Sequence, residues 1–192
     1  MDAIEYVVFD LDKTLVYCEN DSDGEHILNF ADGSSFKCAV RPGFNELLTY
    51  VKRTMRAVFV WSAGSKEYVD KVVEDLFPYK PDMVWSVDMC EKKKDIKDEV
   101  YPYVKPLEKI YFHAGKIFPQ SWNVEYLYRK DSPFPNMYNT VIIDDNPDIG
   151  EENRHNQILV KEYLGGREDR DLYRVMNLLS GRPKRSYLSV QG

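Results

Sequence analysis

The chain has 192 residues, of which 26 are basic and 32 acidic, so that its formal net charge is -6 at pH 7. This length suits one domain that buries roughly 70% of the surface of the unfolded chain. The acidic balance argues against a general nucleic-acid-binding surface. No stretch approaches the roughly 20 apolar residues of a membrane span, and no basic region precedes an apolar leader. We expect a soluble, intracellular monomer, in either the nucleus or the cytoplasm.

The first predicted element is an apolar strand that ends in two acidic residues. Branched and aromatic side chains dominate positions 4–9, which is typical of a strand buried on both faces of a parallel sheet. Asp10 and Asp12 follow this strand directly. Ligands bind at the carboxyl edge of open α/β sheets, so these two carboxylates can divide nucleophile and acid/base work there.

The next segment predicts a β-hairpin insertion at about residues 17–40. Two short apolar runs flank the dipeptide Asp32-Gly33, which is a hairpin signal. The three cysteines, Cys18, Cys38 and Cys90, form no CxxC pair, and their odd number argues against a disulfide framework. We expect free thiols, with a bridge from Cys18 to Cys38 across the hairpin as the less favoured alternative.

The rest of the chain alternates between predicted helices and strands. Apolar residues recur at helical spacing after Arg41-Pro42-Gly43, after Ser65 and at 169–179. Strands are predicted at residues 57–61, 83–87, 140–143 and 157–160. This alternation predicts a doubly wound, mainly parallel α/β sheet in a single domain of residues 1–180. Residues 181–192 are expected to form a flexible basic tail.

An apolar strand that ends in acidic residues is also typical of nucleoside triphosphatases. Such a protein should carry a glycine-rich phosphate loop, and the only Gly-Lys of this chain, Gly115-Lys116, lacks the rest of that motif. The segment 10–17, DLDKTLVY, instead resembles the DxDxT motif of haloacid dehalogenase-like phosphatases. Its form is similar to that of the C-terminal-domain branch, also called NLI-interacting-factor-like.

Three further motifs of this family follow in order. The segment 62–70, SAGSKEYVD, resembles the second motif, with Ser62 in place of a threonine. Lys105 in YVKPL matches the lysine of the third motif. Asp144 and Asp145 match the fourth, acidic motif, where the family usually has Asp-Asn. A receiver domain uses similar residues but places its acidic pair before the acceptor strand, so the order favours the phosphatase family.

The resemblance implies a haloacid dehalogenase-like Rossmannoid core and hydrolysis of a phosphomonoester through an aspartyl-phosphate. Asp10 is then the expected nucleophile and Asp12 the expected acid and base. The expected phosphate-binding residues are Thr14, Ser62, Ala63 and Lys105. The expected Mg²⁺ ligands are Asp10, Asp12, Asp144 and Asp145. The added charge of Asp145 would either strengthen metal binding or shift the pKa of Asp12, and both effects stay open.

The family's substrate class is phosphoserine or phosphothreonine in an extended chain, such as the RNA polymerase II tail. Residues 106–139 form an insertion before the fourth motif that is rich in aromatic residues and prolines. Its aromatic side chains either cup a proline beside the phosphorylated residue or form a small core of their own. Two alternative functions remain, a small-molecule or nucleotide phosphatase and a catalytically weak phosphopeptide-binding module. Large DNA viruses carry compact relatives of this kind, so a viral source is one reading of the resemblance.

Overall fold

The computed structural model describes residues 3–19, 24–93, 102–117, 119, 121–149 and 153–181, so that the expected tail lies outside the described residues after Gly181. Its centre is a five-stranded sheet in which every pairing is parallel. The strand order is β10-β9-β1-β5-β6. The bounds are Tyr6–Phe9 for β1, Ala57–Trp61 for β5, Met83–Trp85 for β6, Thr140–Asp144 for β9 and Gln157–Leu159 for β10. The predicted parallel α/β sheet is confirmed.

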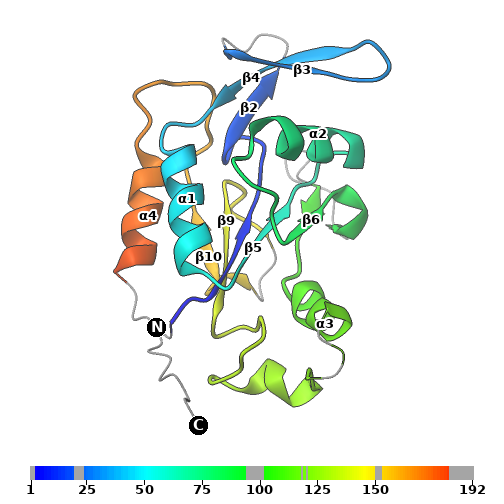
Figure 1. Ribbon diagram of the computed structural model, residues 1–192, viewed down its shortest axis with the longest axis vertical. Helices are drawn as coiled ribbons and strands as arrows, with labels where there is room; N and C mark the ends of the chain where they lie inside the picture. Colours follow the sequence, from blue (N-terminus) through cyan, green and yellow to red (C-terminus); the bar gives the residue numbers. More distant parts are fainter. Residues whose placement is uncertain are drawn as a thin grey trace.

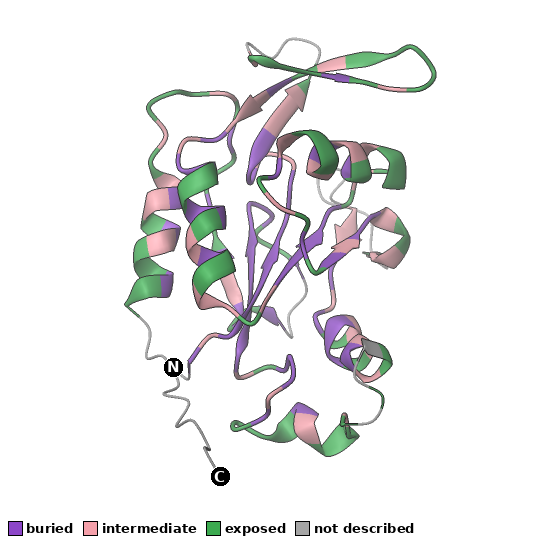
Figure 2. Cartoon of the chain, in the orientation of Figure 1, coloured by how far each residue is buried: buried purple, intermediate pink, exposed green. Residues whose placement is uncertain are grey.

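The central strand β1 separates two apolar cores. Val7 and Phe9 face one core, whereas Tyr6 and Val8 face the other, because successive side chains of a strand point to opposite faces. Figure 2 shows the central strands buried along their length. This two-sided burial explains why the strand sequences are continuously apolar.

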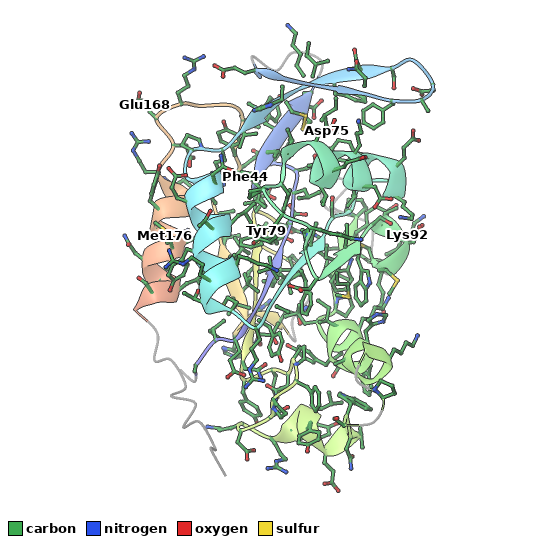
Figure 3. All side chains as sticks on the ribbon, viewed as in Figure 1. Phe44, Asp75, Tyr79, Lys92, Glu168 and Met176 are labelled. Atoms are coloured by element: carbon green, nitrogen blue, oxygen red, sulfur yellow. A yellow bond between two sulfur atoms is a disulfide. The ribbon has the colours of Figure 1, made fainter. Side chains whose placement is uncertain are left out.

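Three helices cover the first core (Figure 1). They are α1, Phe44–Thr54, α2, Lys66–Leu76, and α4, Asp171–Ser180. Figure 3 labels Phe44 of α1 and Met176 of α4, which lie on the same side of the sheet and belong to this core or pack against it. As predicted, Ser65 caps α2, and its hydroxyl accepts a hydrogen bond from the Tyr68 N–H.

The aromatic insertion covers the second core. It contains α3, Glu108–Ile117, and the 3₁₀ helix η2, Val124–Tyr128. Before the insertion, a shorter 3₁₀ helix η1, Val87–Met89, replaces the predicted end of strand β6. Ile110, Tyr111 and Leu127 are buried against β1 and β5. The insertion therefore completes the core of the main sheet instead of forming a separate small core. Among the described residues, no helix combines the length and apolar character that crossing a membrane would require.

A separate antiparallel sheet lies beyond the carboxyl ends of the central strands (Figure 1). Its strands, in the order β2-β4-β3, are β2, Val16–Glu19, β3, His26–Asn29, and β4, Ser35–Val40. The predicted hairpin is β3-β4, and Gly33 in its turn has φ 86°, a conformation that favours glycine. A short third sheet pairs β7, Glu91–Lys92, with β8, Tyr103–Val104.

The prediction of free thiols is wrong for two of the three cysteines. Cys18 of β2 and Cys38 of β4 lie directly opposite each other and form a disulfide bond. The register of two antiparallel strands places these side chains together, and cysteine spacing alone does not reveal that register. Cys90 has a free thiol, as expected.

A buried arginine joins the loop after β1 to the start of α4. The Arg41 guanidinium donates from Nη1 to the Thr14 carbonyl oxygen at 2.9 Å. It also donates from Nε and Nη2 to the two carboxylate oxygens of Asp169, at 2.8 and 2.9 Å. Asp169 accepts in turn from the backbone N–H of Asp171, which is the first residue of α4. This bidentate ion pair therefore fixes the loop that carries Asp12.

The Arg41–Asp169 pair predicts a pH-dependent stability. Burial acts to raise the pKa of Asp169, but the Arg41 hydrogen bonds outweigh it and lower the pKa below its usual value. Such a carboxyl stabilises the fold above its unfolded-state pKa and loses this contribution as the pH falls through its folded-state pKa. We expect Asp169→Asn to destabilise the protein by about 2 kcal/mol at pH 7, and by progressively less below about pH 4.

Thermal unfolding of both proteins between pH 7 and pH 3 measures this difference. Asp131→Asn is the matched control because Asp131 forms an exposed ion pair with Arg129, and we expect little change at any pH. A stability difference for Asp169→Asn that does not vary with pH would contradict the proposed dependence of stability on the ionisation of Asp169.

Candidate active site

A cavity of about 310 Å³ opens at the carboxyl edge of the central sheet. Among its lining residues are Asp10, Asp12, Ser62, Ala63, Lys105, Asp144 and Asp145. A larger cavity of about 620 Å³ lies elsewhere, between α3 and residues such as Tyr6 and Phe59, and its lining contains none of the predicted site residues. The site residues expected from the sequence thus meet in one place, with the exception of Thr14.

Strand register brings three of the motifs together. Phe9 of β1 pairs with Val60 of β5 and with Ile143 of β9, so that these three strands end at nearly the same level. The Asp10 N–H donates to the Ile143 carbonyl oxygen at 3.0 Å. The side chains that follow these strands therefore converge, as the carboxyl ends of parallel strands do.

Lys105 lies between two of the carboxylates. Its Nζ atom is 2.5 Å from Asp10 Oδ1 and 2.7 Å from Asp144 Oδ2, and all three side chains are buried. Burial alone would lower the pKa of Lys105, but the two carboxylates outweigh it and raise that pKa. Asn153 holds the lysine backbone, because its Nδ2 donates to the Lys105 carbonyl oxygen at 3.0 Å. Lys105 is therefore a fixed cation.

Asp12 has different surroundings from Asp10. The Tyr68 hydroxyl of α2 donates a short hydrogen bond to Asp12 Oδ1, and the Ser62 hydroxyl donates to Asp12 Oδ2 at 3.3 Å. Burial, and then the charge of Asp10, raise the pKa of Asp12 to about 6, although these hydrogen bonds act in the opposite direction. Asp12 can thus carry a proton near neutral pH.

Thr14 positions the acidic motif instead of lining the cavity. Its hydroxyl donates to Asp145 Oδ1 at 3.0 Å and accepts from the Asp145 N–H at 3.0 Å. The side chain is completely buried. The Thr14 side chain therefore contacts the acidic motif and is absent from the cavity lining.

Three carboxylates provide the oxygen donors that a divalent cation prefers. Among the described residues, Asp10, Asp144 and Asp145 form the group whose candidate ligand atoms all lie within 4.8 Å of one another. Burial raises the pKa of Asp144 to about 7 and that of Asp145 to about 6, and the charge of Asp10 acts in the same direction on both. This crowding of carboxylates fits a hard cation such as Mg²⁺. This group does not include the Asp12 carboxylate, which accepts hydrogen bonds from Tyr68 and Ser62.

Tyr68 and Lys13 are among the residues at this site that sequence reasoning missed. Tyr68 occupies an apolar position of α2 by spacing, and its likeness to a tyrosine of the second motif was the available signal. Lys13 lines the cavity and has φ 59°, which its sequence position did not indicate. Both contacts depend on how α2 and the loop after β1 are placed.

Comparison with known proteins identifies a matching family and solved structures with a similar fold. The family described as NLI interacting factor-like phosphatase matches residues 5–186. The structure of Fcp1, an essential RNA polymerase II CTD phosphatase, is 16% identical with a TM-score of 0.58 and covers 93% of this chain. A variant of the fission yeast RNA polymerase II CTD phosphatase Fcp1, bound to beryllium fluoride, is 18% identical with a TM-score of 0.51 and also covers 93%. These likenesses show the fold.

The chain spans 61% and 50% of the lengths of those two solved structures. Among proteins with curated descriptions, none matches the chain significantly in sequence.

The hydrogen bond from Tyr68 to Asp12 predicts a measurable role. We expect Tyr68→Phe to lower kcat for an aryl phosphate about tenfold with little change in KM, because Asp12 loses the donor that orients it. Steady-state kinetics with p-nitrophenyl phosphate measures both constants.

Tyr79→Phe provides the matched control for this substitution. The Tyr79 hydroxyl donates to the Leu48 carbonyl oxygen, and neither residue lines the cavity. Equal kcat values for Tyr68→Phe and Tyr79→Phe would show that the Tyr68 hydroxyl does not act through Asp12.

Proposed function

The chain belongs to the family of NLI interacting factor-like phosphatases, and from this premise we propose that it hydrolyses phosphomonoesters through an aspartyl-phosphate intermediate. One observation carries the proposal. Asp10 and Asp12 line the same cavity in contrasting surroundings, the first paired with a lysine and the second raised in pKa to about 6. Carboxylates held in contrasting surroundings can take the separate roles of nucleophile and acid.

Asp10 is the nucleophile in this proposal. Its ion pair with Lys105 holds the side chain at the strand end, beside a cation that can also meet phosphoryl oxygens. In the first step an Asp10 oxygen bonds to phosphorus while the bond from phosphorus to the ester oxygen breaks. Positioning and charge neutralisation supply most of the catalysis in such a transfer.

Asp12 is the proposed acid and base. In its protonated form it gives a proton to the departing ester oxygen. As a carboxylate it then takes a proton from the water that attacks phosphorus, and the bond from Asp10 to phosphorus breaks. A pKa of about 6 supports this exchange, because both protonation states are accessible near neutral pH.

The turn before α2 is the proposed cradle for the phosphate. Ser62 is buried at the cavity, and Ala63 and Gly64 line it just before the helix begins. The first turn of a helix has unpaired N–H groups and a positive end of the dipole, both of which favour an anion. Lys105, which also lines the cavity, supplies a full positive charge.

Mg²⁺ is the proposed cofactor, with Asp10, Asp144 and Asp145 as the residues that would hold it. When bound, such a cation neutralises the charge of the phosphoryl oxygens. The oxygen-only donor set supports a hard cation over a thiol-seeking metal.

Phosphoserine or phosphothreonine in a protein is the proposed substrate class. Its support is the fold shared with two structures of Fcp1, which are named as RNA polymerase II CTD phosphatases. The catalytic cavity also opens at the sheet edge, beside the exposed residues Ala63 and Ser65. An accessible site of this kind can admit a phosphorylated side chain on a longer chain.

Substitution of the two aspartates tests the mechanism. We expect Asp10→Asn to lower kcat by at least about a thousandfold, because the nucleophile is lost. We expect Asp12→Asn to retain substrate binding and to slow turnover or trap the phosphorylated enzyme. Rapid-quench kinetics and intact-protein mass measure turnover and trapping. Full activity of purified Asp10→Asn protein would refute the assignment.

A substrate panel tests the class and the metal. We expect hydrolysis of phosphoserine and phosphothreonine peptides in Mg²⁺, loss of activity in EDTA and recovery when Mg²⁺ is restored. Nucleotides and sugar phosphates, at equal concentration, should be hydrolysed more slowly. A preference for nucleotides would favour a nucleotide phosphatase, and binding of phosphopeptides without turnover would favour a binding module.

A further inference from the structure

Among the described residues, two lysines line the catalytic cavity, and they lie in different surroundings. Lys105 is buried between Asp10 and Asp144, whereas 37% of the Lys13 side chain is exposed. Lys13 directly follows Asp12 in the sequence. The cavity therefore has an inner cation beside the nucleophile and an outer cation at its rim.

The backbone of Lys13 is held in an uncommon conformation. Its φ is 59°, and among the described residues it is the one non-glycine position with positive φ. Two backbone hydrogen bonds of 2.7 Å hold it, from the Lys13 N–H to Val16 and from the Tyr163 N–H to the Lys13 carbonyl oxygen. The tertiary structure thus determines the direction of this side chain, and strain of this kind is concentrated at functional sites.

The Lys13 ammonium contacts a carboxylate in this structure. Its Nζ atom is 2.5 Å from Glu162 Oε1, and 43% of the Glu162 side chain is exposed. Glu162 adjoins Tyr163, so that the same segment contacts both the backbone and the side chain of Lys13. Exposed ion pairs contribute little to stability, and an incoming anion can therefore replace Glu162 at low cost.

The proposed mechanism places the substrate chain on the side of Lys13. Asp12 protonates the ester oxygen of the phosphorylated residue, so the rest of the substrate extends from the Asp12 side of the phosphate. In the same mechanism Lys105, which is paired with Asp10, is the cation that meets the phosphoryl oxygens instead. The neighbours of the phosphorylated residue are thus the groups that can reach the rim.

We propose that Lys13 is a specificity-determining residue that binds an anionic group next to the phosphorylated residue of the substrate. This anionic group would compete with the Glu162 carboxylate for the Lys13 ammonium. The group is either an acidic side chain or a second phosphate, because the ammonium is a point charge that can bind either anion. This inference rests on the proposed function and narrows its substrate class.

Peptide kinetics tests the inference. The substrates are phosphoserine peptides in which the residue directly before or after the phosphoserine is varied. That residue is alanine, aspartate or a phosphonate analogue of phosphoserine that cannot be hydrolysed. The readout is the ratio of kcat/KM for each anionic peptide to that of its alanine partner, which cancels any general loss of activity. We expect wild-type ratios of about 3 to 10 at low salt that shrink at high salt. The aspartate and phosphonate peptides distinguish the two sources of charge.

Four variants define the source of this ratio. We expect Lys13→Met to bring it close to one, Lys13→Arg to retain it, and Glu162→Gln to increase it by removing the competing carboxylate. Lys71→Met is the matched control, because Lys71 forms an ion pair with Asp75 on α2 outside the cavity, and its ratio should equal the wild-type value.

Two results would overturn the inference while the proposed function stands. In the first, the wild type hydrolyses p-nitrophenyl phosphate and all the peptides, but the kcat/KM of each anionic peptide equals that of its alanine partner. The other is an anionic preference that persists in Lys13→Met. If the wild type hydrolyses no phosphomonoester, the proposed function fails, and the inference fails with it.

Discussion

The ion pairs from Lys105 to Asp10 and Asp144 are the interaction on which the site depends. Three charged groups lie together in a buried position, where each would be costly alone. Their charges compensate one another only if β1 and β9 pair in the observed register and if Asn153 holds the lysine segment. The arrangement of charges in the site therefore depends on the pairing of strands that are distant in the sequence.

The loop after β1 is fixed by contacts from several parts of the chain. Arg41 binds its Thr14 carbonyl oxygen, the Thr14 hydroxyl bonds Asp145, and Tyr68 bonds Asp12. These contacts come from the segment after β4, the end of β9 and helix α2. Each acts on a different atom of the loop, and together they limit how far its two carboxylates can move. Such preorganisation is what phosphoryl transfer requires of a protein.

Neither addition to the core supplies a described residue that lines the catalytic cavity. The β2-β4-β3 sheet lies beyond the carboxyl ends of the central strands and is cross-linked by the Cys18–Cys38 disulfide. The aromatic insertion covers the second face of the sheet through α3 and η2. The central strand β1 is thus buried on both faces.

The parallel α/β class, the positions of α1, α2, α4 and the five central strands within a few residues, and the order of four motifs could all be predicted from the amino-acid sequence, whereas helix α3 could not. These features are local, since they depend on apolar spacing, turn residues and short motifs. Three contacts became visible in the tertiary structure alone: the Cys18–Cys38 bond, the hydrogen bonds of the Thr14 hydroxyl to Asp145, and the hydrogen bond from Tyr68 to Asp12. Each of these contacts joins residues 20 or more positions apart, and no local pattern encodes strand register or the direction of a side chain across a packed core.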